Sequence, residues 1–391
     1  MEYTSRVEDK LVYVVLTPTL EESAATFSDG KAYGPMHIWM RCIGSTIKGY
    51  FYLEVLSDGD QLVHPPERYK IVSAVRFFAN GEPVHTLEST VAGGEFTVDL
   101  SKFGSTTTSA VEISFSSWRH FAKFPTSECA PPPPDTDTNA PQLVMNLVTL
   151  DRSFSQHYTP PDVAAISNHV RFHSCALNIS RFEIVSQYQD VGLFLQDETL
   201  LQLAKSKALK FVVKGNSPAQ LTGVNYKWQV VEMNVNILSH WGENVRILFW
   251  DPDEYLVMHP FSLKEFRRKL VEYDVVNIQR KPVVCETCST REQERDFHSI
   301  GGGGGSKFVQ SDKHLATKLA INPNKAGCVL VHFSLCPDST TNKIRLDSRI
   351  AYLAHFENLF RFCALGIRQT LPHGSRSNSI TGRHGQWAVG F

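Results

Sequence analysis

The sequence predicts a β-rich α+β protein, in which an N-terminal antiparallel β-sandwich is followed by an α+β domain closed by a C-terminal helix. Short runs of β-branched and aromatic residues, separated by turn residues, fill the first 125 positions. After residue 142 strand-like and helix-like runs are interspersed, and the 24 phenylalanines come with few alanine-rich runs. With 391 residues, 42% hydrophobic and 20% charged, the chain is long enough for two or three globular domains.

Residues 1–125 are predicted to form the β-sandwich domain. Six runs there have the composition of strands, and turn residues separate them. The predicted strands are 11–16, 36–42, 50–56, 69–78, 95–100 and 111–115. Asn80-Gly81 lies between Phe78 and Val84 and is a two-residue hairpin signal. Six or more short strands at this spacing are typical of a sandwich.

The segment 126–142 is predicted to be a Pro-rich linker. Four consecutive prolines, Pro131 to Pro134, impose a polyproline II conformation, and the residues that follow are polar. A ligand for an SH3 or WW domain is the alternative interpretation. The α+β domain is then expected to span 143–373, interrupted by a flexible Gly-rich loop at 291–312, and residues 374–391 are expected to form a flexible basic tail.

Elements of the second domain follow from local patterns. Strands are predicted at 143–150, 176–185, 208–213 and 327–335, with helices at 160–166, 197–205 and from 262 onward. Between residues 231 and 237 apolar and polar residues alternate strictly, which is the period of a half-buried strand. Together with the run 245–250, this segment predicts a β-hairpin.

The helix from 262 and a C-terminal helix have more specific signals. Ser262 is placed to cap a helix, with Glu265 reaching back to its backbone N–H, and Phe266 and Leu270 share one apolar stripe. Apolar residues spaced by three or four between Leu346 and Ile367 predict a long C-terminal helix over about 347–369. We expect this helix to pack on the sheet of the second domain, because the segment after the Gly-rich loop has too few elements to bury much surface alone.

The termini and cysteines predict an intracellular protein, cytoplasmic or nuclear, with no membrane partner. The N-terminus is polar and acidic, and no apolar run approaches the roughly 18–20 residues that cross a bilayer. The eight cysteines are scattered through a long chain and are expected to be reduced thiols. Asn178-Ile179-Ser180 matches a glycosylation sequon, which has no use in such a compartment.

One pair of cysteines has the spacing of a metal site. Cys285 and Cys288 form a CxxC, and two thiolates at this spacing can chelate one ion. Cys328, His332 and Cys336 are candidate partners, although along a strand they extend over roughly 26 Å and so do not all ligate together. The favoured interpretation is unligated thiols and no cofactor, with a structural zinc as the alternative.

An acidic cluster follows the predicted strand 245–250. Asp251, Asp253 and Glu254 are placed as metal-binding acids are in many nucleases, and Lys264 is the nearby lysine that could steady an attacking water. Turn chemistry around Asp251-Pro252 explains the same residues and is the favoured interpretation. Neither a nucleophile elbow nor a P-loop spacing occurs. The leading hypothesis therefore assigns no catalytic residues.

Basic residues define a candidate nucleic-acid-binding surface. They are Arg267, Arg268 and Lys269 on the outside of the predicted helix, with Arg280 and Lys281 further on. A solvated helix face is the alternative, and the formal net charge of −1 does not favour binding of polyanions by the chain as a whole.

The predicted function rests on good core patterns without a convincing catalytic set. We predict a non-enzymatic protein-interaction or assembly (scaffold) protein, whose β-sandwich presents edges or loops to a protein partner. The alternative is a nucleic-acid-binding protein or metal-dependent nuclease, which would use the acidic cluster and the basic helix surface. Whether the chain is an enzyme stays open, with a preference for no.

Overall fold

The structure is a computed structural model of the 391-residue chain. It describes residues 2–8, 10–17, 33–55, 73–79, 82–89, 93–103, 111–115, 118–122, 129–131, 140–149, 160–186, 191–213, 225–259, 262–285, 308–310, 315–332, 334 and 341–356. The chain divides into two compact units. The first unit comprises Met1–Gln142, Asn216–Ile247 and Ile321–Asn342, and the second comprises Leu143–Gly215, Leu248–Ala320 and Lys343–Phe391.

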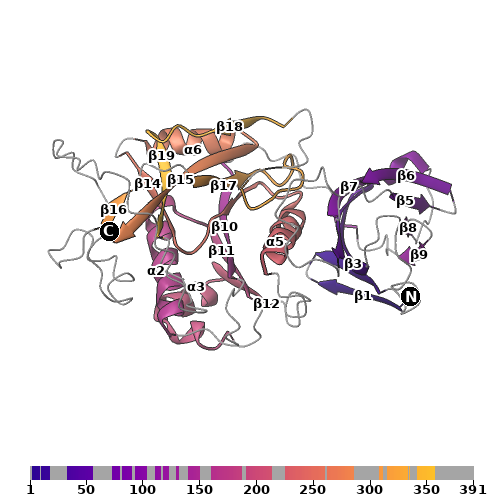
Figure 1. Cartoon of the computed structure of the whole chain (residues 1–391), viewed down its shortest axis with the longest axis horizontal. Coiled ribbons are helices and arrows are strands. Elements are labelled where there is room, and N and C mark those ends of the chain that lie inside the picture. Colours follow the sequence, from indigo (N-terminus) through magenta and orange to yellow (C-terminus); the bar gives the residue numbers. More distant parts are fainter. Residues whose placement is uncertain are drawn as a thin grey trace, which may run out of the picture. The chain divides into compact units, whose positions relative to one another are not determined.

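Two antiparallel sheets belong to the first unit (Figure 1, indigo to purple). The five-stranded sheet has the order β1-β2-β3-β4-β7, with β1 Glu2–Glu8, β2 Leu11–Thr17, β3 Tyr33–Ile43, β4 Thr46–Val55 and β7 Gly93–Asp99. The four-stranded sheet has the order β6-β5-β8-β9, with β5 Ser73–Ala79, β6 Glu82–Ser89, β8 Val111–Phe115 and β9 Trp118–Ala122. The six predicted strands are confirmed, and the pairing of β5 with β6 confirms the predicted hairpin.

Helix α5 (Asn225–His240) stands where the sequence predicted the first strand of a hairpin, so that prediction is wrong. Residues 231–238 are all buried, which hides the usual helical period. The polar residues of the alternation are accommodated inside: Asn234 donates to Val329 O (2.9 Å) and accepts from Val329 N (2.8 Å). Arg41 of β3 donates to the carbonyls of Leu238 and Ser239 in the last turn of α5.

A disulfide joins Cys42 of β3 to Cys129, with the two Cα atoms 4.5 Å apart. The backbone beside it is also fixed, because Ala130 N donates to Cys42 O (3.0 Å) and Gly44 N donates to Ala130 O (2.8 Å). The prediction that the cysteines are reduced is therefore wrong for this pair. Spacing alone did not reveal it, because the bond joins residues 87 positions apart.

A ten-stranded mixed sheet dominates the second unit. The first residue of β10, the first three of β13 and the last of β17 are assigned to the first unit. Its main order is β12-β11-β10-β13-β17-β15-β19-β14, and β16 and β18 pair with β15. The strands are β10 Gln142–Thr149, β11 Arg181–Ser186, β12 Leu209–Val213, β13 Val245–Phe249, β14 Glu254–Met258, β15 Val275–Cys285, β16 Phe308–Gln310, β17 Leu315–Ile321, β18 Lys343–Arg345 and β19 Ala351–Phe356. Strands β10, β11 and β12 are parallel, whereas β14 and β19 are antiparallel.

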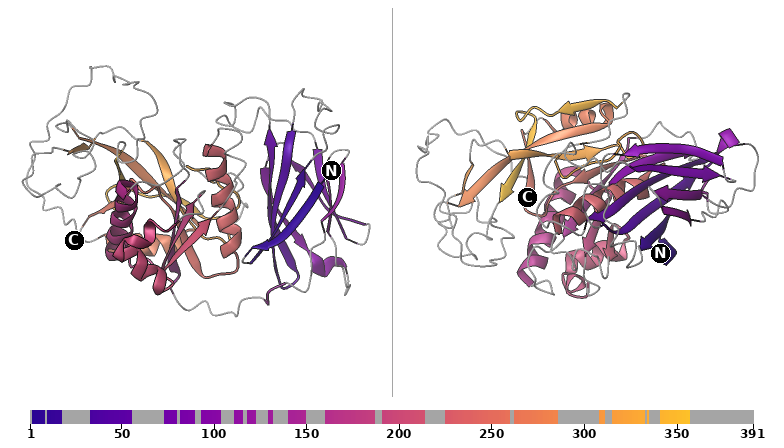
Figure 2. Two further views of the ribbon diagram at one scale, coloured as in Figure 1. Left: turned by 90° about the horizontal axis from the view of Figure 1, so that it is seen from below. Right: turned by 45° about the vertical axis from the view of Figure 1, so that its right-hand side comes forward.

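Three helices of the second unit complete its core: α2 (Pro160–Leu177), α3 (Glu198–Lys205) and α6 (Leu263–Glu272). Helices α2 and α3 lie side by side in both views of Figure 2. Asp197 caps α3 by accepting from Leu200 N (3.1 Å). Ser262 stands at the N-cap of α6, but its side chain makes no capping hydrogen bond, and Glu265 pairs with Arg268 instead of closing a capping box.

The predicted C-terminal helix is wrong where the structure describes it. Residues 351–356 form β19, which pairs with β14 on one side and β15 on the other, so strand pairing overrides the three-to-four spacing. Of the predicted strand 327–335, the described residues form one isolated bridge, between Val329 and Ser334. The helix predicted at 160–166 is confirmed and extends to Leu177.

A β-rich α+β class is confirmed by mixed sheets and, within the described ranges, four α-helices. Some predicted features lie outside the described residues: Pro132 to Pro134 of the linker, Gly301 to Gly305 of the loop, and the tail 374–391. Phe308–Gln310, at the end of the predicted loop, forms β16.

Candidate active site

The acidic segment Asp251 to Glu254 forms a tight turn between β13 and β14. Glu254 N donates to Asp251 O (3.0 Å), which closes the turn. The Glu254 side chain reinforces it, because Oε2 accepts from Asp251 N at 2.8 Å. The turn chemistry expected from Asp251-Pro252 is thus present, and it directs three carboxyl groups to one place.

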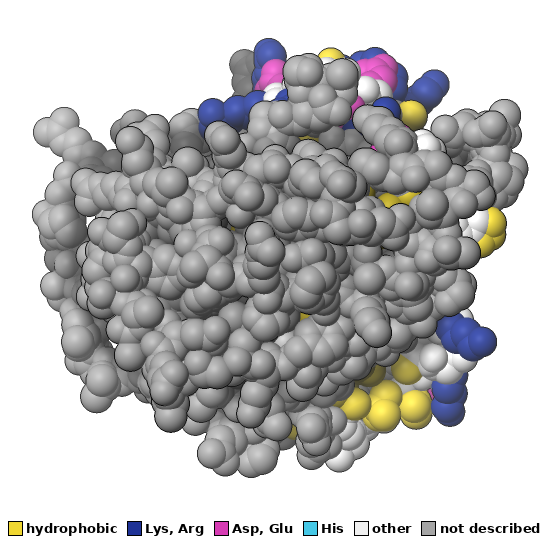
Figure 3. Space-filling model, turned by 90° about the vertical axis from the view of Figure 1, so that its right-hand side faces the viewer, with side chains coloured by type: hydrophobic (Ala, Val, Ile, Leu, Met, Phe, Trp, Pro, Cys, Tyr) yellow, Lys and Arg dark blue, Asp and Glu magenta, His cyan; other side chains and the backbone are white. Residues whose placement is uncertain are grey.

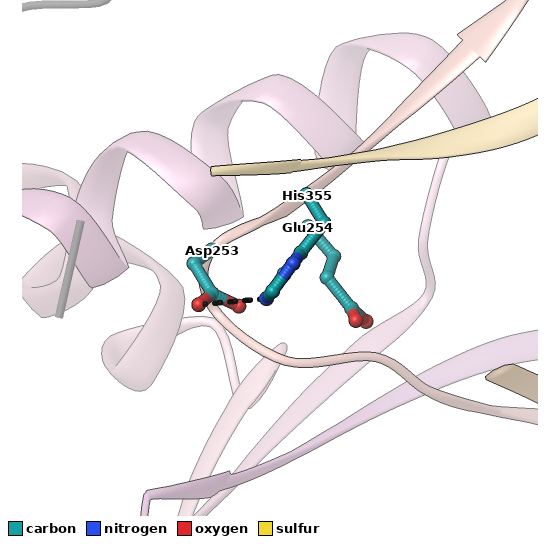
Figure 4. Close-up of side chains that lie close together, drawn as sticks. All are labelled: Asp253, Glu254 and His355. Carbon is teal, nitrogen blue, oxygen red and sulfur yellow. Dashed lines mark ion pairs between the residues drawn. The ribbon is translucent and has the colours of Figure 1, made fainter. Parts of the chain in front are cut away.

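Strand pairing brings a histidine to this turn. Glu254 lies opposite His355 in the antiparallel β14–β19 pair, and Phe356 N donates to Asp253 O (3.0 Å). His355 Nε2 lies 3.3 Å from Asp253 Oδ2. One ligand atom from each of Asp253, Glu254 and His355 falls within 4.8 Å of the others, a grouping able to hold a metal ion. Figure 4 shows the imidazole between the two carboxylates, with its ion pair to Asp253.

Two buried cations face the acids from the neighbouring strands. Lys318 of β17 lies 2.6 Å from Asp251 Oδ2 and 4.0 Å from Glu254 Oε1, and its side chain is 1% exposed. Arg280 of β15 places Nε 2.5 Å from Glu254 Oε1. The six residues therefore come from β17, β15, β19 and β14 and from the turn between β13 and β14, and these five strands are consecutive in the sheet, in the order β13-β17-β15-β19-β14. We call Asp251, Asp253, Glu254, Arg280, Lys318 and His355 the strand-end cluster.

Burial and charge drive the carboxyl pKa values in opposite directions. Burial alone would raise the pKa of Asp251, but the charge and hydrogen bond of Lys318 outweigh it and lower that pKa to about 2. Burial raises the pKa of Glu254 to about 7, against the pull of Lys318 and Arg280. At neutral pH Asp251 is therefore ionised, whereas Glu254 holds a proton for part of the time.

A buried histidine pair on α2 supports the turn. His173 Nδ1 donates to His169 O (3.0 Å), so Nε2 carries the lone pair and accepts from Leu256 N of β14 (3.3 Å). The His173 ring also packs on Trp250, with ring centroids 5.2 Å apart. Burial lowers the pKa of His173 to about 3 and that of His169 well below its ordinary value, so both rings are neutral at physiological pH.

The predicted residues fall into different places. Asp251, Asp253 and Glu254 are brought together, and Arg280 joins them. Lys264 is exposed on α6, and the buried lysine of the cluster is Lys318 instead.

The predicted basic surface is divided among local partners. Arg267 donates to Leu177 O (3.0 Å), Arg268 pairs with Glu265 and Glu272, and Lys269 lies 3.4 Å from Glu272. Lys281 lies over the Tyr352 ring, 4.2 Å from its centroid. Figure 3 shows Lys/Arg and Asp/Glu side chains interspersed in the coloured part of its upper edge, at the level of α6 and β18 in Figure 1.

The CxxC lies outside the residues whose side chains the structure describes. Cys285 ends β15, and Cys288 lies outside the described part. Cys328 is buried and forms no disulfide. Among the residues that the structure describes, the grouping of Asp253, Glu254 and His355 is the one able to hold a metal ion. A zinc at Cys285 and Cys288 stays a prediction.

Sequence reasoning missed Lys318 and His355. Lys318 had a usable signal, because a lysine in the middle of the apolar run 315–321 needs a buried partner. His355 had little signal, because its run was assigned to a helix, and only the register of β14 with β19 places it beside Asp253.

Comparison with known proteins gives the class. Residues 169–372, just over half of the chain, match glycosyltransferase family 92. The chain therefore belongs to glycosyltransferase family 92. No curated protein matches it. Among solved structures, the crystal structure of 4-diphosphocytidyl-2C-methyl-D-erythritol synthase resembles 48% of this chain and 78% of its own, at 11% identity and a TM-score of 0.24, which supports no argument about function.

Family membership overturns the predicted function. It points to an enzyme that transfers a glycosyl group, so both the non-enzymatic scaffold and the nucleic-acid-binding or nuclease hypotheses are wrong. The scaffold hypothesis rested on the lack of a familiar catalytic motif, and the alternative rested on the acidic cluster and the basic helix surface. The strand-end cluster draws its residues from four strands and the turn between β13 and β14, so it leaves no compact motif in the sequence.

The predicted cytoplasmic or nuclear location is wrong as well. Members of the family are typically lumenal proteins of the Golgi or endoplasmic reticulum. The Cys42–Cys129 disulfide agrees with this, because such bonds persist in oxidising compartments. Within the described residues, the helices are all too short or too polar to cross a membrane.

Proposed function

We propose that this chain transfers a glycosyl group from a nucleoside diphosphate sugar to an acceptor hydroxyl, and that the strand-end cluster holds the donor's diphosphate through a divalent cation. Membership of glycosyltransferase family 92 supports the class of reaction. The position of the cluster, after the end of β13, supports the place, because ligands of sheets with parallel strands bind beyond the carboxyl ends of those strands.

The single observation that carries the site is a pair of unsatisfied ligand atoms. Asp253 Oδ1 and His355 Nδ1 are buried, and neither has a hydrogen-bond partner among the described residues. Leaving such atoms unpaired costs about 1–3 kcal/mol each, so a bound group that satisfies them is favoured. A carboxylate with an imidazole, completed by phosphate oxygens, suits Mn²⁺ or Mg²⁺.

Glu254 is a poorer ligand than Asp253. One of its oxygens accepts from Asp251 N, and the other faces Arg280 and Lys318. Its main role is to hold the turn, and Asp253 and His355 are the two principal ligands that we assign to the ion.

The chain's own charges position this site. Lys318 fixes Asp251, Arg280 fixes Glu254, and His173 holds the following strand through Leu256 N. Asp251 and Glu254 each face a Lys or Arg side chain, whereas the Asp253 carboxylate faces His355. When bound, the divalent ion would stabilise negative charge on the departing diphosphate.

The first test measures metal binding and transfer separately. We expect the full chain to bind Mn²⁺, and we measure this binding as a loss of the spectroscopic signal of the free ion. Asp253→Asn and His355→Gln should each weaken the binding by about tenfold or more. Asp347→Asn is the matched control, because Asp347 is an exposed carboxylate paired with Arg349. Unchanged Mn²⁺ binding in Asp253→Asn would exclude the proposed ion site.

Transfer is then assayed with a panel of nucleoside diphosphate sugars. Activity should fall on chelation and return with Mn²⁺ or Mg²⁺. Transfer that continues at full rate in a chelator would refute the metal-dependent donor site but not the class of enzyme. Release of a nucleoside diphosphate from none of the donors would count against the proposed donor class.

We also propose that residues 1–125 form a β-sandwich domain. Two antiparallel sheets and the six predicted strands support the sandwich. The domain limits at 125, 142 and 373 are proposals of the same kind. Limited proteolysis that cleaves first within β3 or β4, rather than near residue 135, would argue against them.

A further inference from the structure

We propose that Asn178 is an N-glycosylation site. Asn178-Ile179-Ser180 is the single Asn-x-Ser/Thr sequence in the 391 residues. This inference depends on lumenal residence of the chain and not on its transferase activity, so a chain without activity would still carry the glycan.

The local backbone presents the sequon as a surface turn. Helix α2 ends at the buried Leu177, and Asn178 N donates to Ser174 O (3.0 Å). Asn178 has φ of 52°, the left-handed conformation that commonly ends a helix and that asparagine tolerates better than most residues. The chain reverses here, from the end of α2 into β11.

The two side chains that matter are accessible. Asn178 and Ser180 are exposed, whereas Ile179 between them is 8% exposed and anchors the turn. Ser180 N donates to Leu143 O (2.9 Å), which fixes the backbone without using the hydroxyl. No hydrogen bond to another described residue engages the Asn178 amide or the Ser180 hydroxyl. A glycan at Asn178 therefore displaces no contact that the structure shows.

The sequon lies at the end of the sheet where β10, β11 and β13 begin, and the strand-end cluster lies beyond the other end of β13. It precedes the first residue of β11, which is parallel to β10. Strands β10 and β13 are neighbours that begin together, because Gln142 N donates to Asn244 O (3.1 Å). Asp251, in contrast, follows the end of β13. The glycan would thus project from the end of the sheet opposite the proposed donor site.

The compartment supplies the chemistry. In the lumen of the endoplasmic reticulum a chain meets an oligosaccharide linked by a diphosphate to a lipid. The Asn178 amide nitrogen forms a bond to the anomeric carbon of that sugar, and the bond between this carbon and the phosphate oxygen breaks. The lipid diphosphate leaves with the electron pair, and the amide gives up one proton to a base of the cell's oligosaccharide-transferring enzyme. No oxidant or reductant is required.

The test uses the full chain, directed into the endoplasmic reticulum of animal cells by an added cleavable signal peptide. Wild type is compared with Asn178→Gln, Ser180→Ala and the matched control Ser180→Thr, which keeps the sequon. Gel mobility is measured before and after digestion with an amidase that removes N-glycans. Trypsin then releases the peptide 172–181 for mass spectrometry, and amidase treatment in heavy-oxygen water marks a formerly glycosylated Asn178 as labelled aspartate.

We expect wild type and Ser180→Thr to migrate faster after digestion, by the mass of one glycan. Asn178→Gln and Ser180→Ala should already migrate at the faster position before digestion and should not shift. The labelled peptide from wild type tests the proposal even where a variant fails to fold. An unmodified 172–181 peptide from wild-type chain recovered from the lumen would overturn the proposal. So would a shift that persists in Ser180→Ala.

Discussion

The neutral, buried His173 predicts a specific loss of stability in acid. We compare wild type with His173→Gln, in which the amide oxygen can still accept from Leu256 N and the amide N–H can still donate to His169 O. The substitution therefore removes the titrating ring while keeping both hydrogen bonds that the structure shows.

The magnitude follows from the two pKa values. The folded-state pKa of His173 is about 3, because burial disfavours the charged ring, and the unfolded value is about 6.5. Between these values the unfolded chain binds a proton that the folded chain does not, so the free energy of unfolding falls as pH falls below 6.5. From pH 7.5 to pH 5 this single ring costs wild type ~2 kcal/mol, whereas His173→Gln avoids that cost.

Other titrating groups are common to both chains and cancel in the difference. His169 stays neutral beside His173, and the raised pKa of Glu254 gives an opposite trend that both chains share. Urea unfolding at pH 7.5, 6.5 and 5 measures the stability difference, and His259→Gln, at an exposed position, controls for loss of a histidine. A difference between wild type and His173→Gln that is constant across this range would refute the buried neutral ring.

Three further predictions concern the disulfide, the buried lysine and one glycine. Cys42→Ser opens a loop across 87 residues and should cost ~4.5 kcal/mol in urea unfolding under oxidising conditions, with no difference from wild type in reductant. Lys318→Met strands the Asp251 carboxylate and should cost ~3 kcal/mol, of which Asp251→Asn in the same chain restores part. Gly49→Ala places a methyl group on the Phe96 ring and should lower stability by about 1–3 kcal/mol; a melting temperature equal to that of wild type would contradict this packing.

Elements whose burial is one-sided were predictable from the sequence. Strands β2, β3, β8 and β10 have β-branched and aromatic runs between turn residues, and α6 buries Phe266 and Leu270 as its stripe predicts. Helix α5 was not predictable in this way, because a helix buried on every side at residues 231–238 has no apolar face to detect. Asn234 looked like the wet side of a strand, but it is a buried residue that binds Val329.

The candidate site was predictable only in part, and for a related reason. Asp251, Asp253 and Glu254 are close in sequence, so their proximity in space needed no knowledge of the fold. Lys318, Arg280 and His355 reach them only through the strand order and register, which are set by long-range pairing. Local periodicity even favoured a helix at His355, and pairing with β14 and β15 outweighs that local preference.

The strand order also determines when the sheet can be completed during synthesis of the chain. Among the described strands, β14 has β19 as its sole neighbour. Synthesis of β19 is complete at Phe356, 98 residues after β14 ends at Met258. At about 5–20 residues per second, a ribosome needs roughly 5–20 s to cover that distance. Throughout this interval the turn carries its three acids without His355, so a chain that stops short of residue 355 would have most of its sheet and an incomplete strand-end cluster.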